Sequence, residues 1–156
     1  MNKSEIAAKI KETEDQLASL RAKLEEPEYP TLGEAKPGDK LENGCIVVHK
    51  VKDLQLALIA APATTEVRCG WSKEFSDVFD CLAGQGFNKS QWFIPNVKQL
   101  QLAHKNCKEH FASPLYWSST EVSSTDSCFV GFGIGTQSNF SKATTGCVRA
   151  FSLVSY

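Results

Sequence analysis

Histidines and hydroxyl residues that could carry chemistry are present, but their spacing does not match common catalytic or metal sites. His49, His104 and His110 fall in different predicted elements, and the last two are not at the i, i+4 spacing of a helical metal site. The hydroxyl run 118–120 lies in no Gly-x-Ser-x-Gly turn and has no histidine close in sequence. We therefore expect these hydroxyls to hydrogen-bond a tight turn, and we expect no metal site, no cofactor and no enzymatic activity.

The cysteines also lack the spacing of a zinc or redox motif. The closest two, Cys69 and Cys81, are twelve positions apart, which excludes local Cys-x-x-Cys pairs. The N-terminal residues show no apolar segment with a small-residue cleavage site, so no secretion signal is predicted. Buried, reduced thiols are the prediction, with disulfides as the alternative. The cysteines are Cys45, Cys69, Cys81, Cys107, Cys128 and Cys147.

Polar residues in the last third of the chain are better candidates for binding. The segments 122–127 and 137–142 are rich in hydroxyl and amide side chains around one aromatic residue, Phe140, a composition suited to adaptable hydrogen bonding around an anchor. Solvated loops are the alternative interpretation. Tyr116 either packs in the core or contacts a ligand. The predicted ligand-binding residues are Tyr116, Ser124, Asp126, Gln137, Asn139, Phe140 and Lys142.

Three further side chains are interpreted as structural. Trp92 and Trp117 could stack on sugar rings, but burial is favoured for both. Arg149 lies in a predicted strand and requires an acidic partner, because a buried guanidinium without one is costly. Glu121 is the predicted partner.

Charge and hydropathy exclude two classes of partner. The 17 basic and 18 acidic residues give a formal net charge of -1, which provides no long-range attraction for nucleic acid or anionic membranes. The longest apolar stretch, around residues 54–61, is far shorter than the roughly 20 residues that span a bilayer. We expect neither nucleic-acid binding nor membrane insertion.

The elements that would position these residues begin with a helix over residues 1–26. Its apolar side chains alternate at spacings of four and three, which is a heptad seam typical of a coiled coil. An amphipathic helix folded back on the head is the alternative, but the stripe is narrower than such helices show. Three chains are preferred over two, with contacts between heads adding to assembly because three heptads are short. The predicted seam consists of Ile6, Ile10, Thr13, Leu17, Leu20 and Leu24.

A linker over 27–40, ending the helix at Pro27, is predicted from its proline, glycine and charge. The head, 41–156, then begins with a hairpin of strands 45–49 and 54–60, followed by helices over 74–83 and from Asn96. Period-two alternation predicts strands over 128–133 and 138–142, and a single closing strand over 147–154. The predicted class is α+β, with an antiparallel sheet and two helices.

Three sequence blocks in this head resemble a known family. Residues 91–100 (QWFIPNVKQL) resemble the Trp-x-Leu-Pro-x-x-x-Glu-Leu signature of the collagen-like adhesin C-terminal domain family, the Lcl C-terminal domain. Residues 116–121 (YWSSTE) resemble its Tyr-Trp-Ser-Ser-Thr block, and 147–151 (CVRAF) its closing Val-Arg-x-Val strand. The resemblance covers roughly residues 38–156. The sequence departs from the pattern at Phe93 and Ile94, and also at Gln99, a position where the family usually has an acid.

The resemblance implies a fold similar to C-type lectins, found in bacterial surface adhesins and phage proteins behind a trimerising stalk. It implies binding of carbohydrate or protein on a cell surface. Calcium is not predicted, because no Glu-Pro-Asn or Gln-Pro-Asp element accompanies Asp126.

Because no secretion signal is predicted, a phage virion protein fits the sequence better than a bacterial surface adhesin. We expect a homotrimeric viral fibre or spike adhesin that binds a host-surface receptor, with a glycan among the candidates. The alternative is a structural virion decoration protein of the head, neck or tail that binds other virion proteins. An enzyme of the formylglycine-generating type is disfavoured, because no catalytic cysteine pair is recognisable.

Overall fold

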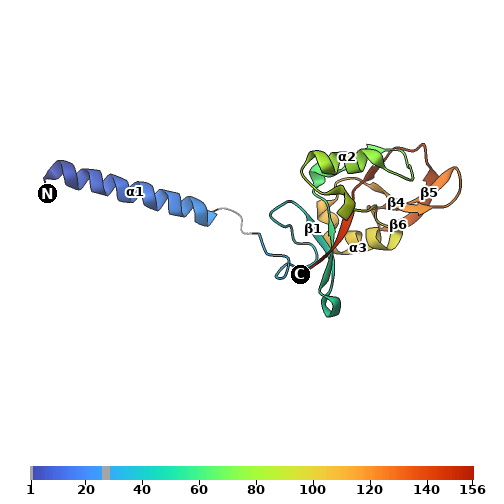
Figure 1. Ribbon diagram of the computed structural model, residues 1–156, viewed down its shortest axis with the longest axis horizontal. Coiled ribbons are helices and arrows are strands. Elements are labelled where there is room, and N and C mark those ends of the chain that lie inside the picture. Colours follow the sequence, from blue (N-terminus) through green and yellow to red (C-terminus); the bar gives the residue numbers. More distant parts are fainter. Residues whose placement is uncertain (1, 26–28) are drawn as a thin grey trace.

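The protein has an α+β fold that joins a long N-terminal helix to a head of two sheets and further helices (Figure 1). The computed structural model describes residues 2–25 and 29–156, and only the backbone of Leu24 and Glu25. The α-helices are α1 (Lys3–Glu25), α2 (Ser76–Gly84) and α3 (Val97–Cys107). The strands are β1 (Ile46–Val51), β2 (Leu56–Ala60), β3 (Val67–Cys69), β4 (Leu115–Glu121), β5 (Asp126–Gly131), β6 (Thr136–Ser141), β7 (Gly146–Val148) and β8 (Phe151–Ser155).

Helix α1 begins with a reciprocal pair of hydrogen bonds. The Asn2 side chain accepts from the Glu5 backbone N–H at 2.8 Å, and the Glu5 carboxylate accepts from the Asn2 N–H at 3.3 Å. This capping box satisfies two N–H groups that the helix itself leaves free. The predicted stop at Pro27 lies outside the described residues. No helix in the described part of the chain is long and apolar enough to cross a membrane.

The head begins with the predicted hairpin. Strands β1 and β2 pair antiparallel, and β2 also pairs antiparallel with β8. We call these three strands the small sheet. The hairpin turns through residues 52–54, and Gln55 adopts a left-handed conformation at φ 49°. The β-branched and aliphatic residues of β1 and β2 suit a sheet covered on both faces. The hairpin prediction is confirmed.

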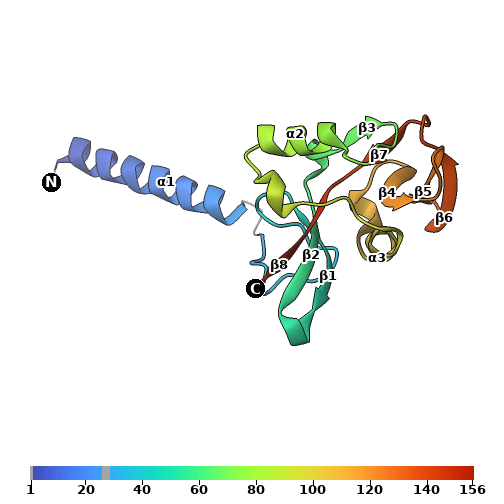
Figure 2. The ribbon, with the colours of Figure 1, turned by 45° about the vertical axis from the view of Figure 1, so that its right-hand side comes forward.

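The large sheet has the strand order β3-β7-β4-β5-β6, so β3 and β6 are its two edge strands. Its pairs are antiparallel except β4 with β7, which are parallel. The prediction of one closing strand over 147–154 is wrong. The chain forms β7 in the large sheet, passes through Arg149 and Ala150, and then forms β8 in the small sheet. This crossing ties the two sheets together (Figure 2).

Helix α3 packs against the small sheet and against β4 and β5. It starts with a capping box between Asn96 and Gln99, as the predicted start at Asn96 requires. Periodicity predicts Val97, Leu100, Leu102 and Ala103 on its inner side. Val97, Leu100 and Ala103 are buried, as is Cys107, and Leu102 is half-buried against the same core. A core of residues from α3, both sheets and Phe111 fills this space.

Helix α2 packs near β3, on the opposite face of the large sheet. It begins at Ser76, two residues later than predicted, because Phe75 is left-handed at φ 43° and its N–H bonds the Ser72 hydroxyl. A second core between α2 and the large sheet contains Trp71, Phe75 and Trp117. Strand β6 lies at the far edge of this sheet from β3, so α2 does not cover it.

Part of the predicted linker is packed structure. Ala35 is buried against the small sheet, and Leu32 packs beside it. The Lys50 ammonium donates to the carbonyls of Leu32, Gly33 and Ala35 at 2.8, 3.2 and 2.9 Å. The Lys50 ammonium therefore holds this part of the predicted linker against the small sheet.

Candidate binding site

The predicted ligand-binding residues other than Tyr116 lie at the corner of the large sheet formed by β6 and the β4–β5 loop. All six residues of β6 are exposed. The strand pairs with β5 from Asp126 opposite Ser141 to Gly131 opposite Thr136, and its other side has no strand in the described residues. An edge strand with exposed side chains and free backbone groups is available to a partner. We call this region the β6 corner.

Phe140 is the aromatic centre of the β6 corner. Its ring is 48% exposed and stacks on the buried Phe129 ring, with centroids 4.8 Å apart and planes 11° from parallel. Phe129 in turn contacts Trp117 edge to face at 6.2 Å. The stack fixes one face of Phe140 against the sheet and leaves the other face to solvent.

Lys142 connects the end of β6 to neighbouring elements. Its ammonium lies 3.5 Å from the Glu121 carboxylate, donates to the Ser124 carbonyl at 3.2 Å and lies 4.8 Å from the centre of the Trp71 ring. A partly exposed ion pair of this kind contributes little to stability. Its effect is to join the end of β6 to β4 and to the β4–β5 loop.

The β4–β5 loop has its own hydrogen bonds. The Ser123 hydroxyl accepts from the Asp126 N–H at 3.0 Å and from the Thr125 N–H at 3.3 Å. Ser124, the predicted ligand contact, is exposed at the tip, and its carbonyl is bound by Lys142. Asp126 is half-buried at the start of β5.

Gln137 and Asn139 point to the other face of β6 from Phe140, because strand side chains alternate. The Cys128 thiol donates to the Asn139 carbonyl oxygen at 3.0 Å, and the Gln137 amide donates to the same sulfur at 3.4 Å. A small ligand on Phe140 therefore does not also meet these two side chains. The predicted set shares one corner but not one face.

Tyr116 is not part of this corner, and its prediction as a ligand contact is wrong. It is fully buried, with ring centroids 5.1 Å from Phe111 and 4.8 Å from Phe132. Its hydroxyl accepts from the Ser113 N–H at 3.2 Å. Burial raises the pKa of Tyr116, with the nearby Glu66 carboxyl adding to the effect. The residue lies on the face of β4 that α3 and Phe111 cover.

The structural interpretations of the tryptophans and of Ser118 can now be assessed. Trp117 is fully buried as predicted, whereas Trp92 is only half-buried, edge to face with Phe87 at 5.5 Å. The buried Ser118 hydroxyl donates to the Cys128 carbonyl at 2.8 Å and accepts from the Thr120 N–H at 3.1 Å. The prediction of a tight turn after Trp117 is wrong, because residues 118–120 belong to strand β4. The Ser118 hydroxyl instead binds backbone groups where the β4–β5 register shifts.

The predicted partner of Arg149 is wrong. Its guanidinium Nη2 lies 3.7 Å from the Glu66 carboxylate, and Glu121 pairs with Lys142 instead. Arg149 points toward the end of β4 where Tyr116 and Phe111 lie, while Glu121 is at the opposite end of that strand. The sequence does not show which acidic residue lies beside Arg149, because the two partners are far apart along the chain.

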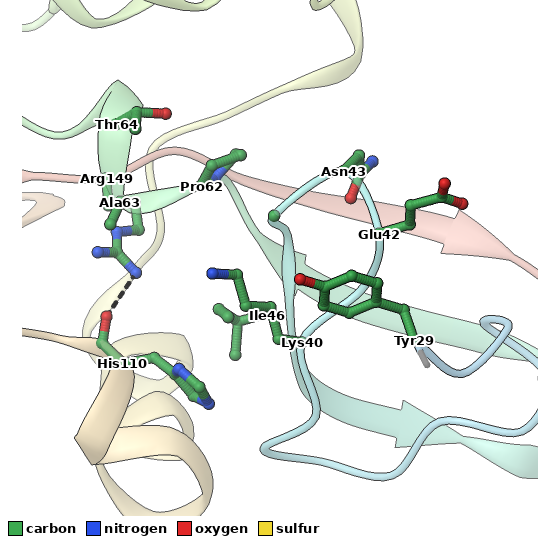
Figure 3. Close-up of a pocket in the computed structure, with 11 residues that line it drawn as sticks. Tyr29, Lys40, Glu42, Asn43, Ile46, Pro62, Ala63, Thr64, His110 and Arg149 are labelled. Carbon is green, nitrogen blue, oxygen red and sulfur yellow. Dashed lines mark hydrogen bonds between the residues drawn. The ribbon is translucent and has the colours of Figure 1, made fainter. Parts of the chain in front are cut away.

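A pocket that no sequence pattern indicated lies beside the segment before β1 (Figure 3). Its lining comes from separate parts of the chain, which is why local patterns could not reveal it. They contribute Tyr29, Lys40, Glu42, Asn43, Gly44, Ile46, residues 62–64, His110 and Arg149. No group of three or more His, Cys, Asp or Glu side chains with metal-binding geometry occurs among the described residues.

Comparison with protein-family models and with curated proteins finds no match for this chain. The resemblance to the adhesin domain family therefore stays a prediction from the three sequence blocks.

Proposed function

We propose that this chain is a self-associating adhesin whose N-terminal helix joins several copies and whose head binds a receptor on a host cell surface. Three chains are the preferred number. The head is proposed to be C-type-lectin-like and the assembly to be a viral fibre or spike. A surface glycan is among the candidate receptors, and no enzymatic step is involved.

The observation that carries this proposal is the exposure of the α1 seam. Ile6, Ile10, Leu17 and Leu20 are between 45% and 58% exposed, and every described side chain of α1 through Lys23 is exposed. Thr13 donates its hydroxyl to the Lys9 carbonyl at 3.0 Å, within the helix. The Leu24 side chain lies outside the described residues. A row of aliphatic side chains in water is unfavourable, by roughly 25 cal/mol per Å² of apolar surface. Packing against the same row of other copies removes that cost.

The assembly is tested by light scattering coupled to size exclusion. We expect the intact chain to give three times its 17.1 kDa mass. Leu17→Glu places a charge in the seam and should give single chains, because a buried unpaired carboxylate is costly. Ser19→Glu is the matched control, since it adds the same charge to the same helix outside the seam. Single chains for the intact protein would contradict the proposal.

Receptor binding is tested with whole host cells and the assembled protein. Phe140→Ser should reduce cell binding about tenfold or more, because aromatic anchors of this kind dominate binding surfaces. Ile134→Ser is the matched control: Ile134 is also an exposed hydrophobic residue, 79% exposed, but lies in the turn at the other end of β6. Equal cell binding by the two variants would contradict a role for the β6 corner.

The exposed seam also favours an alternative, a structural virion protein whose helix packs against another virion component. In that case the head would be a spacer. Antibody against the head should then leave adsorption to host cells unchanged, whereas the adhesin proposal requires that it block adsorption.

A further inference from the structure

The pocket beside the segment that precedes β1 has the size of a small-molecule site. Its volume is about 320 Å³, at the lower end of the range for ligand pockets. Tyr29, Lys40 and Asn43 come from the chain before β1, and Thr64, His110 and Arg149 come from the body of the head. The walls are therefore formed by the chain before β1 and by several separate parts of the head.

Arg149 brings an incompletely compensated positive charge to this pocket. It is 1% exposed, and its Nη1 donates to the His110 carbonyl at 3.0 Å. Its Nε and Nη2 have no hydrogen-bond partner among the described residues. The Glu66 oxygen 3.7 Å from Nη2 is itself unbonded, so this pair is loose. A buried guanidinium in this condition is stabilised by any additional negative charge nearby.

Lys40 adds a second positive charge from the opposite wall. Its ammonium points into the space between Tyr29 and Arg149 in Figure 3, and it makes no ion pair within the described residues. The Glu42 carboxylate, the acidic group that lines the pocket, is turned away from this space. His110 bonds the Gly38 carbonyl at 2.8 Å through Nε2, with Glu109 at 3.7 Å from the same nitrogen.

Tyr29 completes the pocket. Its ring is exposed, and its hydroxyl points toward the same space as the Lys40 ammonium. An exposed tyrosine offers an apolar face for the C–H groups of a sugar and a hydroxyl for its polar groups. The Thr64 hydroxyl, which donates to the Gln85 side chain at 2.8 Å, is a further polar group on the rim.

We propose that this pocket binds an acidic sugar, with the carboxylate attracted by Lys40 and Arg149 and the sugar ring packed on Tyr29. The carboxylate follows from the two cations. The choice of a sugar follows from the tyrosine, and it rests on the proposed receptor-binding role of the head. The site is separate from the β6 corner, with which it shares no residue.

The test is ligand-observed NMR with the intact chain and three probes: D-glucuronate, D-glucose and acetate. Glucuronate should show saturation transfer and a measurable Kd, and glucose should show none. Acetate should bind more weakly than glucuronate. Lys40→Met should weaken glucuronate binding about tenfold, the usual effect of removing one charge-assisted contact. Tyr29→Ala should weaken it as well.

Lys36→Met is the matched control, because Lys36 is an exposed lysine of the same segment that does not line the pocket. It should bind glucuronate as the unaltered chain does. Three results would each overturn the proposal. They are equal binding of glucose and glucuronate, equal glucuronate binding by Lys40→Met and the unaltered chain, and no binding of glucuronate. Acetate binding as tightly as glucuronate would overturn the assignment to a sugar.

The outcome is independent of the cell-binding experiment. The probes are small and monovalent, so they report on the pocket whether or not the copies assemble. If Phe140→Ser loses cell binding but still binds glucuronate, the two sites are separate. If Lys40→Met loses glucuronate binding but still binds cells, the same conclusion follows.

Discussion

At the scale of single residues, burial decides the chemistry of the thiols. The cysteines are all free, and Cys45 and Cys107 are completely buried. Burial raises the pKa of Cys45 to about 11 and that of Cys107 to about 12, because a thiolate is poorly solvated in the core. Such thiols react slowly with alkylating reagents and pack as small apolar groups.

These shifts predict that stability falls in alkaline solution. Above the ordinary thiol pKa of 9.0 the unfolded chain loses thiol protons that the folded chain keeps, up to about pH 11 for Cys45 and 12 for Cys107. The free energy of unfolding should then decrease by about 1.4 kcal/mol per pH unit for each thiol. Urea unfolding between pH 7 and pH 11 measures this slope.

Cys107→Ala should make that alkaline slope shallower. Val48→Ala, at another completely buried position, should lower stability equally at every pH and leave the slope unchanged. An identical slope in Cys107→Ala and the unaltered chain would show that Cys107 does not contribute.

At the scale of elements, β7 is closely packed at Gly146. This short strand lies between β3 and β4 and leads into the crossing that joins the two sheets. A side chain at Gly146 would collide with the Leu115 side chain and with the buried Trp117 ring, whose Nε1 lies 2.8 Å from where a Cβ atom would stand. Trp117 is held by a bond from Nε1 to the Cys69 carbonyl at 3.2 Å, so it cannot move freely.

Gly146→Ala should therefore destabilise the head by about 1–3 kcal/mol, the usual range for overpacking a core. Gly33→Ala is the control, because a side chain there meets no atom within 4 Å. Chemical unfolding of both variants measures the difference. A Gly146→Ala variant as stable as Gly33→Ala would mean that Trp117 shifts without cost.

At the scale of the whole molecule, the packed cores all belong to the head. The hydrophobic clusters of the described residues contain no residue before Leu32, and the described side chains of α1 are exposed. Folding of the head therefore does not depend on α1, whereas the proposed assembly does.

A chain of residues 29–156 should fold and remain a single chain in solution. Its thermal midpoint should not change with protein concentration, because nothing dissociates when it unfolds. Calorimetry over a range of concentrations, with light scattering, measures both properties. Assembly of this shortened chain to the same size as the intact protein would show that the heads alone associate.

Sequence patterns were sufficient wherever one element decides the outcome. The heptad row of α1, the β1–β2 hairpin, the cap at Asn96 and the inward residues of α3 follow from periodicity and turn chemistry within a short stretch. The exposure of Phe140 and the burial of Trp117 were also predicted correctly. A local pattern shows which side of an element is apolar.

Tertiary structure alone decided which elements face one another. It buried Tyr116 under Phe111, placed Glu66 instead of Glu121 beside Arg149, and divided the last predicted strand between two sheets. It also packed the segment from Leu32 onto the small sheet and so formed the pocket. These contacts join residues distant in sequence, and their energies depend on the packing of whole elements, which no short stretch of sequence contains.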